Sequence, residues 1–280
     1  MHGSVLPFLA AAAYAGLALW FLKTRWLSRP ASAGLAPWER GAILAVLVLH
    51  GDILAEQLLA TEAPRFGFAF ALSAMLWVAV LFYWAESFFV QLEALLPAAL
   101  GLAALCAPLT VWFPGRVPAT TALEFRIHLA LAILAYGVLT IALLHAILMA
   151  LVERLLHRKP RSAEGAPRSV LEGPYAGLPP LLTLERMLFN LIALGFVLLT
   201  LTLASGMTLS DSLFGRALRF NHETLLAIVS WVVFAILLAG RWLRGWRGRT
   251  ALRWTLGGFV MLLLAYVGSR FVLEVLLGRS

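Results

Sequence analysis

The sequence predicts an all-α fold: a polytopic membrane bundle of eight transmembrane helices with both termini outside. Three observations lead to this prediction. Of the 280 residues, 62% are hydrophobic and only 13% are charged, and the apolar residues fall into eight long runs. A soluble domain is about 45–50% apolar and about 25% charged, so a protein with one soluble core is excluded. We expect one integral membrane domain over residues 1–280, with membrane lipid as its surroundings.

Each apolar run is about as long as a membrane-spanning helix, which needs about 20 apolar residues. Helices also satisfy their own backbone hydrogen bonds within lipid. The runs are continuous and rich in leucine and alanine, without the alternation typical of strands. The expected spans are approximately 4–22, 41–60, 66–85, 88–113, 122–152, 187–209, 223–240 and 252–276.

Lysine and arginine are concentrated in alternate loops. The loops after the first, fifth and seventh spans hold 15 of them, and the opposite side holds 6. The positive-inside rule therefore places these three loops in the cytoplasm of a bacterium and both termini outside the inner membrane. The net charge of +8 belongs to these loops, so it requires no nucleic-acid partner. The loop after the third span is the weakest point of this count, because it carries Glu86 and Glu93 and no lysine or arginine.

The longest expected loop is 153–186, which is rich in proline, glycine and charged residues. Such a composition is typical of a flexible connection. We expect a flexible basic cytoplasmic loop that joins a five-helix part to a three-helix part.

Sequence motifs for hydrolytic catalysis are absent. The chain has no P-loop, H-E-x-x-H or G-x-S-x-G string and no zinc-ligand spacing. Its one cysteine, Cys106, excludes an internal disulfide, a C-x-x-C redox pair and a C-x-x-C-H haem attachment site. We therefore expect no catalytic residues, and a protein that is not an enzyme.

Two histidines are expected near the outer surface. His128 lies about one and a half turns from the outer end of the fifth span, and His222 opens the seventh span in the string RFNHET. Ionisable groups are costly within a bilayer, so each is a candidate for function. Two neutral imidazoles at similar depth on different helices can ligate one haem iron. The alternative is two unrelated interfacial histidines.

Two further histidines are expected deeper in the bundle. His145 follows His128 by 17 residues, which places it about 25 Å further along the helix, too far to share one haem. His50 lies near the middle of the second span. Both could form a second, inner site, but we favour hydrogen bonds across helices.

Charged residues also lie within the apolar runs. Asp52 and Glu56 are four residues apart and so share one helix face, and the spacing of Arg270 and Glu274 suits an intrahelical ion pair. Arg270 could instead meet Asp52, Glu56 or a haem propionate, because its planar fork suits a carboxylate. We favour an ion pair that closes the bundle.

Three segments together resemble a known family. They are residues 126–156 (RIHLALAILAYGVLTIALLHAILMALVERLL), 179–206 (PPLLTLERMLFNLIALGFVLLTLTLASG) and 221–274. The histidine–tyrosine spacing that opens the first, the L-G-F-x-L-L-T-x5-S-G run of the second and the G-W-R-G-R loop of the third are the distinguishing strings. The sequence resembles the integral membrane cytochrome c assembly family (the CcsA/CcmC/HemX group), and most of all its short YpjD/HemX-like branch. Residues 120–276 carry the resemblance, and 1–115 match only as four spans.

The resemblance implies a haem site. In the haem-handling members, two outer histidines flank a tryptophan-rich external motif and ligate haem, and His128 and His222 match that pair. His50 and His145 match the family's inner histidines only loosely. Where the family has W-G-x-x-W-x-W-D, this sequence has MTLSDSLFGRALRFNHET, with no tryptophan.

The resemblance implies a membrane protein that binds non-covalent haem b and acts in, or assists, haem delivery for c-type cytochrome assembly. Its partners would be other assembly proteins, and Arg270 or Arg219 would meet the propionates. The alternative is a HemX-like, non-enzymatic regulator or scaffold of tetrapyrrole synthesis, whose loop 153–186 binds an enzyme of that pathway. A third reading is a small transporter that uses Asp52, Glu56 and Arg270.

Overall fold

The eight expected helices are present in the structure. This computed structural model describes residues 5–27, 34–59, 65–90, 93–118, 120, 122–157, 180–214 and 221–277. Within these ranges, eight helical segments are long and apolar enough to cross a membrane, and the remaining regular structure is one isolated bridge between Phe66 and Arg116. The prediction of an all-α bundle of eight transmembrane helices is confirmed.

The first four spans come from the N-terminal 112 residues. The first is extended by a π-helical segment, and the fourth is built from three short pieces, with Pro97 in the first turn of α4 and Pro108 directly before α5. The elements are α1 (Val5–Phe21) with η2 (Leu22–Leu27), α2 (Pro37–Leu59), α3 (Phe68–Glu86), and η3 (Glu93–Leu95) with α4 (Leu96–Cys106) and α5 (Leu109–Trp112).

The last four spans include the two longest helices. The eighth span contains two π-helical segments, one on each side of a short α-helical turn that carries Arg270. Segments of this kind occur frequently at functional sites. The elements are α6 (Leu123–His157), α7 (Leu181–Phe214), α8 (His222–Arg244), and α9 (Gly248–Leu263) with η4 (Leu264–Gly268), α10 (Ser269–Phe271) and η5 (Val272–Leu276).

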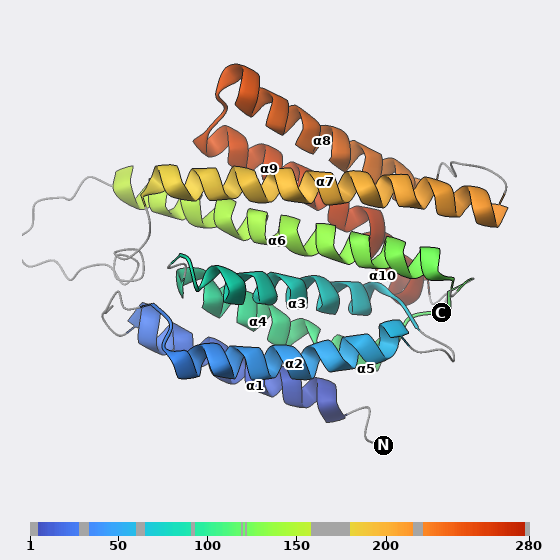
Figure 1. Cartoon of the computed structure of the whole chain (residues 1–280), viewed down its shortest axis with the longest axis horizontal. Coiled ribbons are helices and arrows are strands. Elements are labelled where there is room, and N and C mark those ends of the chain that lie inside the picture. Colours follow the sequence, from blue (N-terminus) through green and yellow to red (C-terminus); the bar gives the residue numbers. More distant parts are fainter. Residues whose placement is uncertain are drawn as a thin grey trace, which may run out of the picture.

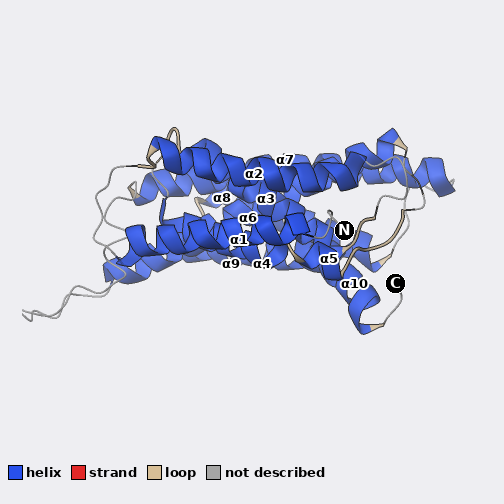
Figure 2. Cartoon of the chain, turned by 90° about the horizontal axis from the view of Figure 1, so that it is seen from below, coloured by secondary structure: helices blue, strands red, loops and turns tan. Residues whose placement is uncertain are grey.

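The helices run side by side in one bundle (Figures 1 and 2). The helices α1, α2 and α4 lie on one side, α3 and α6 lie in the middle, and α7, α8 and α9 lie on the other side (Figure 1). The central helix α6 contacts both α3 and α7, so it joins the first four spans to the last three. The start of α1 and the end of the eighth span lie at the same end of the bundle.

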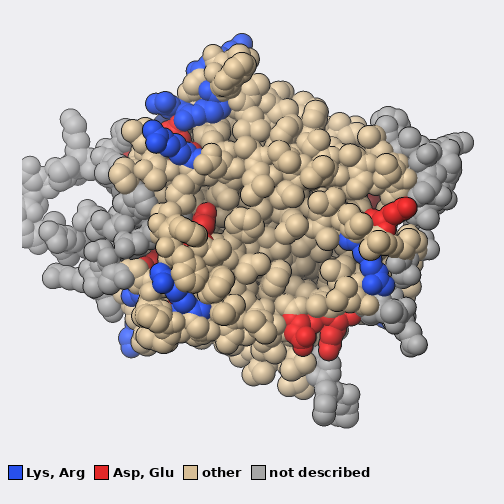
Figure 3. Space-filling model, in the orientation of Figure 1, with Lys and Arg blue, Asp and Glu red and all other residues tan. Residues whose placement is uncertain are grey.

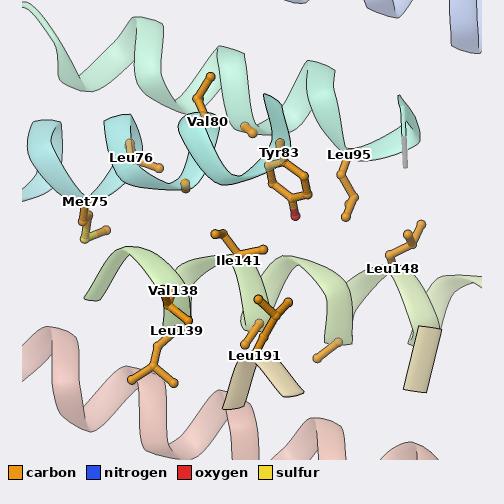
Figure 4. Packing of buried hydrophobic residues seen from close by; sticks show 14 of the residues in the cluster. Met75, Leu76, Val80, Tyr83, Leu95, Val138, Leu139, Ile141, Leu148 and Leu191 are labelled. Carbon is orange, nitrogen blue, oxygen red and sulfur yellow. The ribbon is translucent and has the colours of Figure 1, made fainter. Parts of the chain in front are cut away.

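The core lies between α3, α6 and α7, where leucine, isoleucine, valine and methionine side chains interdigitate (Figure 4). Two glycines of this core allow neighbouring helices to approach closely. A Cβ added at Gly137 would overlap Val78 of α3, and one added at Gly195 would overlap Leu139 of α6. Small residues at such positions are typical of helix contacts in membranes.

Helix ends differ from the expected bounds by a few residues. The largest difference is at the expected loop 153–186, because α6 continues to His157 and α7 begins at Leu181. The apolar run ends at the first charged residue, whereas long charged side chains can remain helical and reach the interface. The rest of that loop, 158–179, lies outside the described residues.

Charged side chains gather toward the two ends of the bundle, and a broad band without them lies between (Figure 3). We call the end that holds Arg25, Arg40, Arg241 and Arg249 the basic end, and the other end, where α6 and α8 begin, the opposite end. That the basic end faces the cytoplasm stays a prediction from the positive-inside rule.

Candidate functional site

His128 lies in the second turn of α6, half-buried against α7. Its Nδ1 is 3.0 Å from Ser205 Oγ, and Ser205 Oγ is 3.0 Å from the carbonyl oxygen of Thr202. A carbonyl oxygen can only accept, so Ser205 donates its single hydrogen to Thr202 and accepts the Nδ1 hydrogen of His128. This network assigns the Nδ1–H tautomer, which leaves a lone pair on Nε2.

The Nε2 atom of His128 has no hydrogen-bond partner among the described residues. A metal-binding imidazole has this arrangement, since its second nitrogen is held by an outer partner that fixes the tautomer and the ring orientation. Gly206 makes room for the ring, because a Cβ added there would lie only 3.1 Å from His128 Cε1. His128 is therefore fixed in place and open at one nitrogen.

His222 is the first residue of α8, and it is exposed. The helix start is fixed beside it, because Asn221 Oδ1 accepts a 2.9 Å hydrogen bond from the Thr224 backbone N–H. His222 and His128 thus both lie at the opposite end, as the sequence predicts (Figure 1). No direct contact joins the two rings within the described part of the chain.

Helix α8 is held on α7 by one aromatic side chain. Trp231 Nε1 donates a 2.8 Å hydrogen bond to Thr200 Oγ1, and its ring stacks on Phe196 with centroids 5.3 Å apart. Both contacts lie on the same helix as Ser205, which holds His128. Helix α7 therefore holds His128 and also packs against α8, the helix that begins with His222.

Arg270 pairs with Glu223, the residue that follows His222 in sequence. Arg270 Nε lies 3.8 Å from Glu223 Oε1, and its guanidinium lies 5.5 Å from the centre of the Tyr266 ring. The expected ion pair that closes the bundle is therefore present, but its carboxylate comes from α8, and the intrahelical pair with Glu274 is not formed. Arg270 thus lies beside the first turn of α8.

Four buried polar atoms at the same end have no hydrogen-bond partner within the described ranges. They are Arg270 Nε, Arg116 Nε and both carboxylate oxygens of Glu274. The Glu274 side chain enters a space that exists because Gly67 has no side chain, since a Cβ there would lie 2.7 Å from its Oε2. Such unpaired groups call for water, an ion or a ligand, and the guanidinium groups suit an anion.

His50 and His145 belong to two separate networks. Both nitrogens of His50 are engaged, with Tyr14 Oη 3.2 Å from Nδ1 and Ser73 Oγ 2.8 Å from Nε2. His145 contacts Tyr83, which follows Ser73 by ten residues on α3 and so lies about 15 Å further along that helix. The structure therefore does not bring the two histidines into one inner site.

The three residues considered for transport are not brought together. Asp52 and Glu56 are exposed on α2, where Figure 3 shows an acidic patch, whereas Arg270 is paired with Glu223. No group of three or more histidine, cysteine, aspartate or glutamate residues within the described ranges could hold a metal ion. Arg219 lies outside the described residues.

Reasoning from the sequence missed three residues that shape this site: Ser205, Gly206 and Glu223. A signal for two of them was present, because the L-G-F-x-L-L-T-x5-S-G string ends at Ser205 and Gly206. Glu223 carried no signal of its own, since its partner is 47 residues away in sequence.

The fold and the site define a multi-pass helical membrane protein with two histidines, His128 and His222, at one end. The family model described as cytochrome c assembly protein matches residues 42–277, so the chain belongs to the cytochrome c assembly protein family. It is a multi-pass protein of the bacterial inner membrane.

Several curated proteins are similar over parts of the chain. Inner membrane protein YpjD of Escherichia coli (strain K12) is 34% identical over 150 residues, which are 54% of this chain and 52% of the relative. An Azospirillum brasilense 28.8 kDa protein is 36% identical over 152 residues, with the same coverage. Cytochrome c biogenesis protein CcsA of Synechococcus sp. (strain JA-3-3Ab) is 31% identical over 116 residues, 41% of this chain and 34% of that protein. The chain spans about half the length of the first two relatives and a third of the CcsA protein.

Proposed function

We propose that this protein binds non-covalent haem b and acts in, or assists, haem delivery during c-type cytochrome assembly. The observation that carries the proposal is His128, whose Nδ1 is held by Ser205 while Nε2 stays open, in a chain of the cytochrome c assembly family. The similar CcsA proteins are named for cytochrome c biogenesis, and this name supports the same proposed function.

The residues at the opposite end suit a haem group chemically. His128 Nε2 would be one axial ligand, and His222, which is exposed at a helix start, would be the other. Arg270 would meet a propionate, because its Nε lacks a hydrogen bond and its pair with Glu223 is long, at 3.8 Å. When bound, the iron supplies reversible ligation and one-electron chemistry. The chain itself holds and orients the group.

The role that follows is that of a carrier or accessory rather than an enzyme. The segment between α7 and α8 lacks the tryptophan-rich string of the haem-handling members. A protein without that platform would hold haem and pass it to other membrane-bound assembly proteins, which are its proposed partners. No covalent step by this chain is needed.

The test is the absorption spectrum of the detergent-purified protein, oxidised and reduced, beside His128→Ala, His222→Ala and the control His157→Ala. We expect a bis-histidine spectrum in the wild type and in the control, and loss of that spectrum in each of the other two variants while circular dichroism stays helical. A wild-type protein that stays colourless after haem addition would overturn the proposal.

A further inference from the structure

A polar cluster occupies the basic end of the first five spans. Arg25, on the π-helical segment η2, binds two carboxylates at once: Glu39 Oε2 at 2.8 Å and Glu93 Oε2 at 2.6 Å. Glu39 also accepts a 3.0 Å hydrogen bond from Trp20 Nε1. These two carboxylates therefore share one cation.

A third carboxylate of this cluster, Glu86, has no such cation. It is the last residue of α3 and faces His145 of α6, with Glu86 Oε2 lying 3.9 Å from His145 Nε2. The His145 side chain is 0% exposed, and neither of these two atoms has a hydrogen-bond partner in the part of the chain that the structure describes. Two unpartnered polar atoms thus face each other inside the protein.

The other nitrogen of His145 fixes the tautomer. His145 Nδ1 lies 3.0 Å from the carbonyl oxygen of Ile141, which can only accept, and 3.3 Å from Tyr83 Oη, which can accept or donate. The shorter contact requires a hydrogen on Nδ1, and Tyr83 Oη can share that hydrogen as a second acceptor. In the neutral ring, Nε2 then has a lone pair, and that lone pair faces a carboxylate oxygen. Without a proton between them, both atoms are buried and unsatisfied, which is costly.

We propose that His145 and Glu86 together hold one proton, and that they form a proton-binding site at the basic end of the bundle. The proton sits either on Nε2, giving an imidazolium beside a carboxylate, or on Oε2, giving a carboxylic acid that donates to Nε2. Either arrangement leaves the pair neutral and joins the two atoms once the Glu86 side chain moves closer. Interacting groups of this kind titrate as a pair.

The site has a route to solvent. The Glu86 side chain is 18% exposed, and an opening of about 250 Å³, counted with its solvent-filled part, lies beside it. Tyr83, Ser87 and Glu93 line this opening together with leucine and valine side chains. Tyr83 thus lies in the wall of this opening and also against the pair, since its ring stacks on His145 with centroids 5.7 Å apart.

Within the described residues, none of the neighbouring arginines forms an ion pair with Glu86. In the first four spans, Arg25 binds Glu39 and Glu93. Arg40 donates a 2.8 Å hydrogen bond to the Ser87 carbonyl and lies over the Phe88 ring. On the side of α7, Glu185 is bound by Arg241 and Arg247. The proton is therefore the means by which the His145–Glu86 pair stays neutral.

This site is independent of the proposed haem site. His145 lies 17 residues after His128 on the same helix, about 25 Å away along its axis. A result at one site can therefore be separated from a result at the other.

The test uses the full-length protein in detergent at neutral pH, reduced so that any bound bis-histidine iron is diamagnetic. Nitrogen-15 NMR of histidine-labelled protein reports whether His145 is an imidazolium, with its signal identified by loss in His145→Gln. Infrared spectra report whether Glu86 is a carboxylic acid. Glu86→Gln keeps the size and polarity of the side chain, and Glu56→Gln, an exposed carboxylate on α2, is the matched control.

We expect one of two signatures in the wild type: an imidazolium signal from His145, or a protonated-carboxyl band from Glu86. Glu86→Gln should remove whichever is present and leave His145 neutral with its hydrogen on Nδ1, whereas Glu56→Gln should change neither. A wild-type protein with a neutral His145 and no carboxyl band that Glu86→Gln removes would overturn the proposal.

Discussion

His50 in the first half of the bundle and His128 in the second are both transmembrane histidines, and they are held in opposite ways. Both ring nitrogens of His50 have partners, and the side chain is buried. His128 has a partner at one nitrogen only, and it lies half-buried near the start of its helix. The comparison teaches that the number of engaged nitrogens, rather than position in a span, separates a histidine that ties helices together from one that can take a ligand.

The largest expected effect is on stability, from His50→Ala. This change leaves Tyr14 Oη and Ser73 Oγ without their partner and opens a cavity, so it should lower the free energy of unfolding by about 3 kcal/mol. Denaturant unfolding followed by circular dichroism measures it. The haem spectrum of the folded fraction should be that of the wild type. Loss of haem from folded His50→Ala would contradict the claim that His50 only ties helices together.

The next largest effect is expected at Gly206. In Gly206→Val, a branched side chain enters the space that the His128 ring occupies, so the ring must shift. Haem affinity should fall by at least about tenfold, the range seen when the support of a metal ligand is lost. Haem titration at the Soret maximum measures it.

The matched control for Gly206→Val is Gly101→Val on α4, where an added Cβ meets nothing within 4 Å. Gly101→Val should keep wild-type affinity. Equal affinities for the two variants would mean that the ring beside Gly206 does not bind haem.

A smaller effect is expected from Ser205→Ala. The Nδ1 hydrogen of His128 then loses its hydroxyl acceptor, although the Thr202 carbonyl remains nearby, so haem affinity should fall by about a factor of ten. Ser205→Thr keeps a hydroxyl and should restore most of the affinity. If alanine and threonine behave alike, the hydroxyl does not hold the ligand.

The smallest effect on haem is expected from deletion of residues 160–177, which removes most of the basic loop and leaves the helix ends in place. The haem spectrum should be unchanged, because both histidines lie at the other end of the bundle. If the deletion abolishes binding of a tetrapyrrole-synthesis enzyme to this protein, the regulatory alternative gains support.

The fold was largely predictable from the sequence, because a run of about 20 apolar residues has few other solutions in a membrane. The depth of each histidine was predictable as well, since the rise per residue of a helix is constant. What the sequence did not contain is how each helix is rotated against its neighbours. That rotation decides that Ser205 meets His128, that Glu223 meets Arg270 and that Glu86 meets His145.

The π-helical segments are a second reason why the sequence did not predict the contacts of the site. Arg25 reaches Glu39 and Glu93 from η2, and Arg270 lies between η4 and η5. These wider turns change which residues share a face, so periodicity assigned with 3.6 residues per turn could not find these contacts.

The central claim is that His128 is an iron ligand and that His50 is not. The most direct test replaces each by glycine and adds free imidazole to the haem-exposed, folded protein. We predict that His128→Gly lacks the bis-histidine spectrum and regains it with imidazole, whereas folded His50→Gly shows that spectrum with or without imidazole. A His128→Gly protein that keeps the wild-type spectrum without imidazole would contradict the account.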